Sequence, residues 1–140
     1  MTTKNKIAFG IYLINAVAML VVGSVYLFSG EFMPYHSAVI QEEWIDLSEA
    51  QKTLYLGMMR TEAAGFLATG TAILILLIIP FRKMQRWAPY AMSVIGIVEY
   101  LPSAIATYNV AQTTTASPPW IALCMGIGLL IVAIPLSEFD

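Results

Sequence analysis

The chain has 140 residues, of which 59% are hydrophobic and 11% are charged, with a net charge of −2. Soluble domains carry roughly a quarter charged residues, so this composition excludes an ordinary water-soluble globule and predicts one membrane-embedded domain, residues 1–140. The small negative charge argues against a nucleic-acid partner. The single Cys124 excludes an internal disulfide and Cys-x-x-Cys redox chemistry.

Four apolar stretches predict an all-α polytopic fold with four transmembrane helices in an antiparallel bundle. We expect the spans at about residues 7–28, 60–79, 87–108 and 120–136. Each is close to the roughly 20 residues that cross a bilayer as a helix. The partner expected first is therefore the lipid bilayer itself.

The first predicted helix carries one polar side chain near mid-depth, Asn15. A lone Asn at that depth usually forms a hydrogen bond to a neighbouring helix. The connection that follows, residues 29–47, contains four acidic residues and no Lys or Arg. Within it, Ile40, Trp44 and Leu47 repeat at helical spacing, which predicts a short amphipathic helix on the membrane surface, covering one mouth of the bundle.

The second predicted helix begins with a capping box, Ser48 followed three residues later by Gln51, and nothing breaks it before Pro80. Such a helix is longer than a bilayer is thick, so its first turns stand in the interface or in water. One face combines an acidic residue with small ones: Glu62, Gly65, Thr69 and Ala72. Small residues mark close helix contacts in membranes, so we expect Glu62 to face protein, with Arg60 on the other side.

The third predicted helix follows a basic turn at residues 81–86 and contains Glu99, which points into the bundle. Pro102 removes one backbone hydrogen bond and frees the carbonyl of Val98 near that carboxylate. The fourth begins at Trp120, after paired prolines, as is typical of a membrane interface. Lys and Arg precede the first helix and fill the basic turn, so the positive-inside rule places both termini in the cytoplasm and the acidic connection outside.

Glu99 is the strongest candidate for a functional group, because an ionisable side chain inside the membrane is costly. The competing interpretation is a protonated Glu that serves helix packing. Glu62 is the second candidate, although it differs from Glu99 by about 9 Å in depth, so the two approach only through tilt, a kink or bridging water. We expect one outward-facing polar pocket, with these candidate ligand-binding residues: Glu99, Glu62, His36, Tyr100, Tyr108, Asn15 and Arg60.

Other chemistry receives little support from the sequence. His36 is the only histidine, and no spacing of His, Cys and acidic residues signals a metal, so no metal site is predicted. Aromatic residues near the ends of the predicted spans are typical of an aromatic belt at the membrane interface. No particular cofactor is indicated.

Three classes of function fit these features. The first is a membrane protein that binds a small lipophilic molecule in the outward-facing pocket, or acts as an accessory subunit of a membrane complex. The second is a proton-coupled transporter working as a homodimer; small multidrug-resistance exporters are similar in size, but their Glu lies in the first helix and their loops are shorter. The third is a membrane enzyme, an isomerase or oxidoreductase acting on a lipophilic substrate, with the carboxylates as acid and base.

Four motifs along the chain carry a resemblance: MPYHSAVIQEEW, QKTLYLGMMR, PFRKMQRWAPYA and PSAIATYNVAQTTTASPPW. Their order resembles small four-helix bacterial membrane proteins that are loosely grouped with the DoxX-like proteins. The resemblance covers residues 21–136 and implies a bacterial inner-membrane location. It implies no activity and no catalytic residue.

Overall fold

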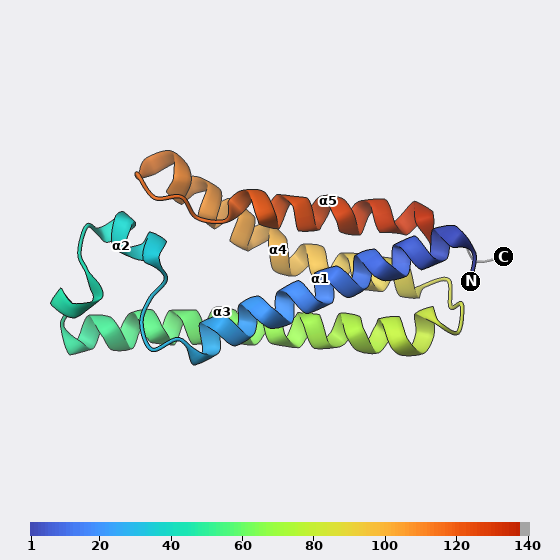
Figure 1. The fold of residues 1–140 in the computed structure, drawn as a ribbon, viewed down its shortest axis with the longest axis horizontal. Helices are drawn as coiled ribbons and strands as arrows, with labels where there is room; N and C mark the ends of the chain where they lie inside the picture. The colour runs from blue at the N-terminus through green and yellow to red at the C-terminus, as the bar shows by residue number, and fades with distance from the viewer. Residues whose placement is uncertain (138–140) are drawn as a thin grey trace.

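The computed structural model describes residues 1–137, which form helices and contain no strand. The elements in chain order are α1 (Thr3–Phe28), α2 (Pro34–Ile40), the short 3-10 turn η1 (Trp44–Asp46), α3 (Glu49–Leu76), the π-turn η2 (Leu77–Phe81), α4 (Ala88–Thr113) and α5 (Trp120–Leu136). The four long helices run along one common axis, and α2 lies across the end that is far from the termini (Figure 1).

Three of the long helices have the length and composition of membrane spans: α1, the continuous helix formed by α3 and η2, and α4. α5 is apolar but has 17 residues and is shorter than these three. Large apolar side chains on the outside of the helices are exposed, among them Ile14, Val21 and Val98. The prediction of an all-helical protein with apolar spans is therefore confirmed.

The helices pack as two pairs. α1 packs mainly against α3, and α4 mainly against α5, while α1–α5 and α3–α4 contacts join the pairs. Glycines allow the close α1–α3 crossing: a Cβ atom at Gly70 would lie 2.9 Å from the carbonyl oxygen of Ala16, and one at Gly23 would lie 2.8 Å from Cγ of Leu67. Small residues permit such close approach of helices in membranes.

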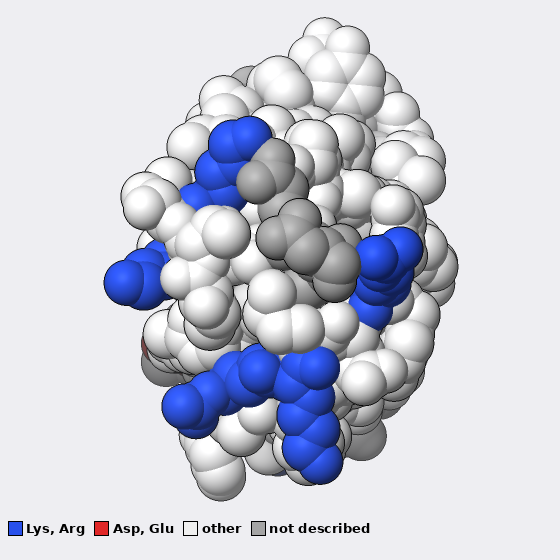
Figure 2. All heavy atoms as spheres, turned by 90° about the vertical axis from the view of Figure 1, so that its right-hand side faces the viewer, with Lys and Arg blue, Asp and Glu red and all other residues white. Residues whose placement is uncertain are grey.

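The two ends of the bundle carry opposite charge. At the end with the described N-terminus and the α3–α4 turn, Lys and Arg are exposed around the face (Figure 2). We call this the basic end; its cations are Lys4, Lys6, Arg82, Lys83 and Arg86. The opposite end, the acidic end, exposes Glu31, Glu42, Glu43, Asp46 and Glu49.

A buried hydrogen-bonded cluster joins three helices toward the basic end. The Tyr12 hydroxyl of α1 donates to the carbonyl oxygen of Pro89 in α4 at 3.0 Å and lies 2.9 Å from Oγ of Ser93. Ser93 in turn donates to the carbonyl oxygen of Leu130 in α5 at 2.9 Å. The fully buried Phe81 packs edge-on against the Tyr12 ring. This end is consequently filled, with the hydroxyls of Tyr12 and Ser93 both paired.

The start of α3 confirms the predicted capping box. Ser48 is the N-cap, its Oγ accepts a hydrogen bond from the backbone N–H of Gln51, and the Gln51 side chain accepts from the backbone N–H of Ser48. At its far end the helix passes through Pro80 as a π-turn and ends at Phe81, two residues beyond the predicted span of about 60–79. The turn brings Phe81 into the core.

The predicted amphipathic helix is shorter than its sequence pattern indicated. α2 ends because Gln41 adopts the left-handed conformation, with φ of 58°. Trp44 then begins a separate 3-10 turn, so Ile40, Trp44 and Leu47 do not share one helix, and that part of the prediction is wrong. Instead they pack with buried Phe32 in a small apolar cluster that holds the connection against α3. We call residues 32–47 the lid.

Candidate functional site

A cavity of about 620 Å³ lies at the acidic end, where the α1–α3 pair separates from α4 and α5. Small-molecule sites in proteins typically have volumes of roughly 300–1,000 Å³. All five α-helices or their caps contribute to its walls, and α2 lies over it. Most lining side chains are apolar or aromatic, with a few polar groups, which is the usual composition of a ligand pocket.

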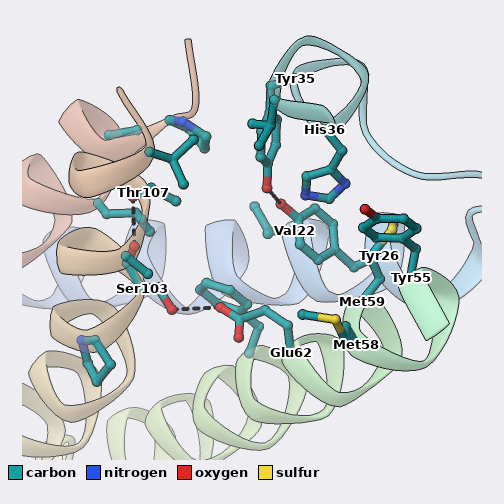
Figure 3. Close-up of a pocket in the computed structure, with 18 of the residues that line it drawn as sticks. Val22, Tyr26, Tyr35, His36, Tyr55, Met58, Met59, Glu62, Ser103 and Thr107 are labelled. Carbon is teal, nitrogen blue, oxygen red and sulfur yellow. Dashed lines mark hydrogen bonds between the residues drawn. The ribbon is translucent and has the colours of Figure 1, made fainter. Parts of the chain in front are cut away.

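The polar group on the α3 side of the cavity is Glu62. Its Oε1 accepts a hydrogen bond of 2.6 Å from the Ser103 hydroxyl of α4 (Figure 3). Thr107, one turn further along α4, donates to the carbonyl oxygen of Ser103 at 2.7 Å. All three residues line the cavity, and Glu62 is half-buried. The helical face that predicted Glu62 to be directed toward protein is the face in contact with α4.

Glu99 lies on the same α3–α4 seam, beyond the lining of the cavity. Its Oε2 accepts from the Thr69 hydroxyl at 3.3 Å. A Cβ atom at Gly65 would lie 2.7 Å from Oε1 of Glu99, so the missing side chain of Gly65 makes room for this carboxylate. Ser103 lies between the two acids: it binds Glu62, and its Oγ is 3.5 Å from the backbone carbonyl oxygen of Glu99.

Two ring-bearing residues of the lid, Tyr35 and His36, lie at the cavity. The Tyr35 hydroxyl forms a hydrogen bond of 2.9 Å with the hydroxyl of Tyr26 in α1 (Figure 3). The His36 ring packs beside Tyr35 and stacks on Tyr55, at centroid distances of 4.2 and 6.4 Å. Its Nδ1 accepts the backbone N–H of Met33 at 3.2 Å, so a neutral imidazole carries its proton on Nε2.

Burial shifts the pKa values of both His36 and Tyr35. It lowers the pKa of His36, because the imidazolium form loses hydration among the surrounding rings. It also raises the pKa of Tyr35, and the hydrogen bond with Tyr26 acts in the same direction. Both groups are therefore neutral near pH 7, and the lid adds no charge to the cavity.

Two predicted pocket residues lie elsewhere in the bundle. Tyr100 is buried between helices, where its ring packs against Phe66 and occupies the space that a side chain at Gly126 would need. Tyr108 is 45% exposed and packs edge-on against Trp120. Neither residue lines the cavity.

Asn15 and Arg60 also lie outside the cavity lining. Asn15 is buried, but its side-chain amide donates to the carbonyl oxygen of Ile11 in its own helix at 3.0 Å, so the predicted interhelical hydrogen bond is wrong for this group. Arg60 is exposed and forms no ion pair with the residues that the structure describes. Of the seven predicted pocket residues, two line the cavity, Glu62 and His36, and Glu99 lies beside it.

Sequence reasoning missed much of the cavity wall. Three residues that were not among the seven candidates line the cavity: Tyr35, Tyr55 and Ser103. Ser103 follows Glu99 by one helical turn, and Tyr35 precedes His36 directly, so proximity to the acidic residues and the histidine was the available signal. Tyr26 offered none, because its contact with Tyr35 depends on the fold of the lid.

Within residues 1–137, no group of three or more His, Cys, Asp or Glu side chains is arranged to hold a metal ion. No protein-family model, curated protein or solved structure matches this chain. The likeness to DoxX-like proteins consequently rests on the sequence motifs alone and stays a prediction.

Proposed function

We propose that this chain is a four-span membrane protein that binds a small lipophilic or amphipathic molecule in the cavity at its acidic end. The observation that carries the proposal is the cavity itself: about 620 Å³, mostly apolar, with a hydrogen-bonded carboxylate on one wall and an aromatic lid above. Protein interiors are otherwise close-packed, so a space of this size indicates room for a ligand.

Two features support α5 as the fourth span. Its 17 residues correspond to about 25 Å of helix, and the proline-preceded Trp120 at its start is an interfacial residue type. The chain begins at the basic end, and α5 also runs back to that end (Figure 1), as an even number of crossings requires.

Charge supports the orientation. The basic end would face the cytoplasm under the positive-inside rule, and the cavity would then lie toward the outer side. The resemblance to DoxX-like proteins supports the inner membrane of a bacterium as the location. Among the three classes considered, a ligand-binding protein needs the fewest additional features, since the carboxylates form no acid–base pair in contact and Glu99 lies off the cavity.

The test uses a neutral fluorescent probe, N-phenyl-1-naphthylamine, with the full chain reconstituted in lipid nanodiscs. Fluorescence above that of empty nanodiscs measures binding to the protein. Ala106 lines the cavity, and Ala106→Phe fills part of it without a change of charge. Ala64 is exposed on the outside of α3, so Ala64→Phe is the matched control.

We expect the probe to bind the wild-type chain and the Ala64→Phe variant, and to bind Ala106→Phe at least several-fold more weakly. Circular dichroism and gel filtration check that both variants fold. Equal binding by the two variants, or no signal above empty nanodiscs, would contradict the proposal.

A further inference from the structure

The cavity contains one acidic side chain and no basic one. Among the described residues that line it, Glu62 is the only Asp or Glu, and none is Lys or Arg. An ionised carboxylate offers about four acceptor positions, and within residues 1–137 Glu62 receives one hydrogen bond, from Ser103. Glu62 lines the cavity and its carboxylate reaches toward Ser103 of α4 (Figure 3), so its remaining acceptor capacity is available to a molecule that occupies the cavity.

Aromatic faces form much of the wall around this carboxylate. Tyr26 comes from α1, Tyr55 and Phe66 come from α3, and Tyr35 reaches in from the lid. The π-face of an aromatic ring attracts a cation, with about 0.5–2 kcal/mol per contact depending on solvent exposure. The wall therefore combines apolar area with groups that stabilise positive charge. The same faces offer no counter-charge to an anion.

The approach to the cavity is also negative. The exposed acidic residues on and next to the lid are Glu31, Glu42, Glu43, Asp46 and Glu49, and the cations in the nearby half of α3 are Lys52 and Arg60. Lys52 itself is paired with Glu49 at 3.1 Å. Clusters of one sign raise the local concentration of ligands of the opposite sign, so this end attracts cations and repels anions.

We infer that the cavity selects lipophilic cations: molecules with an apolar or aromatic body and one positive charge that pairs with Glu62. This inference rests on the proposed function and narrows its ligand class. A full positive charge offsets a carboxylate in an apolar site more strongly than a neutral hydrogen-bond donor does, because Coulomb interactions grow as the dielectric constant falls. A neutral donor ligand is the competing outcome, and the experiment distinguishes the two.

Two ions of nearly equal size and shape make the comparison. Tetraphenylphosphonium is a lipophilic cation, and tetraphenylborate is its anionic counterpart. Equilibrium dialysis against nanodiscs that hold the full chain measures each, and empty nanodiscs give the bilayer contribution for subtraction. The variants are Glu62→Gln, which removes the charge, and Glu62→Asp, which keeps it. Glu42→Gln is the matched control, since Glu42 is exposed at the same end and does not line the cavity.

We expect tetraphenylphosphonium to bind the wild-type chain and to lose about tenfold or more in affinity with Glu62→Gln. Glu62→Asp retains most of the binding, and Glu42→Gln, which removes one of the five surrounding acidic charges outside the cavity, weakens it far less than Glu62→Gln does. Tetraphenylborate binds more weakly to the wild-type chain and does not weaken with Glu62→Gln. Unchanged gel-filtration profiles and retained naphthylamine binding by Glu62→Gln show that this variant is folded.

The possible failures are distinguishable. The charge preference is overturned if the two ions bind equally, or if Glu62→Gln leaves tetraphenylphosphonium binding intact. The proposed lipophilic pocket still stands in either case, provided that binding of the naphthylamine is weakened by Ala106→Phe. If neither ion nor the naphthylamine binds above empty nanodiscs, the proposed function falls together with this inference.

Discussion

The two ends of this bundle are built from the same four helices but differ in how closely their side chains are packed. Toward the basic end, large side chains such as Phe81 and Met92 are fully buried, and Tyr12 connects α1 to α4 through hydrogen bonds. At the acidic end the helix pairs separate around a cavity of about 620 Å³, and a lid takes the place of a packed core. The difference indicates that stability resides mainly at the basic end, and the acidic end is where we propose that a ligand binds.

Such a separation has a physical basis. A side chain that closes a cavity would stabilise the fold but remove the site, so binding sites are commonly less well packed than the rest of a protein. Here the closely packed half holds the helices in register. The lid is attached by one interhelical hydrogen bond, Tyr35 to Tyr26, and by an apolar cluster around Phe32. We therefore expect the lid to open without global unfolding.

The largest expected effect comes from truncating one phenylalanine at each end. Phe81→Ala should lower the free energy of unfolding by about 3–5 kcal/mol, because the ring is fully buried beside Tyr12. Phe32→Ala should lower it by less than about 1 kcal/mol, because the lid can open locally at smaller cost. Chemical unfolding in detergent micelles, followed by tryptophan fluorescence, measures both. Equal losses would remove the distinction between the two ends.

A smaller effect is expected from deleting one hydroxyl at each end. Tyr12→Phe should cost about 1 kcal/mol of global stability, since it removes the hydrogen bond to Pro89 and the contact with Ser93. Tyr35→Phe should leave global stability nearly unchanged and speed hydrogen exchange in residues 34–47. Tyr55→Phe is the control, because its hydroxyl forms no hydrogen bond with the described residues. A global loss from Tyr35→Phe would show that the lid is part of the cooperative core.

The smallest expected effect is a pH dependence confined to the acidic end. Burial lowers the pKa of His36 below its ordinary 6.5, so between these values the open lid binds a proton that the closed lid does not. The stability of the closed lid is therefore complete above pH 6.5 and is lost as the pH falls through 6.5 toward the lowered pKa. Protonation of Nδ1 also ends its hydrogen bond with Met33.

Hydrogen exchange of residues 34–47, corrected for intrinsic rates, should accelerate several-fold between pH 7.5 and pH 5.5. His36→Gln should abolish this dependence, since Gln does not titrate, while exchange around Tyr12 stays constant in both proteins. An acceleration that survives in His36→Gln would assign the effect to another group.

What the sequence could predict was local or periodic. The capping box at Ser48 and Gln51 involves neighbours in the chain, so it fixed the start of α3 correctly. Helical periodicity correctly directed Glu62 and Thr69 toward protein, since both positions follow from 100° per residue once a helix is given. The length of the apolar runs likewise predicted the three helices that have the length and composition of membrane spans.

What the sequence could not predict depended on a single backbone angle or on distant contacts. The left-handed φ of Gln41 ended α2 early, and nothing in the apolar pattern around it indicates that angle. Tyr12 and Ser93 lie 81 residues apart in the chain, so their pairing follows only from the packing of α1 against α4. Asn15 could form its hydrogen bond within or between helices, and its residue type alone does not decide which.

The close α1–α3 crossing has a mechanical consequence for the cavity. Gly23 and Gly70 let α1 and α3 pack at van der Waals distance, so these two helices cannot move closer together. The facing wall includes Pro102, whose ring removes a backbone hydrogen bond inside α4 and makes it the easier helix to bend. Ligands of different width, if the cavity binds them as we propose, would thus be accommodated by bending of α4, while α1 and α3 keep their positions.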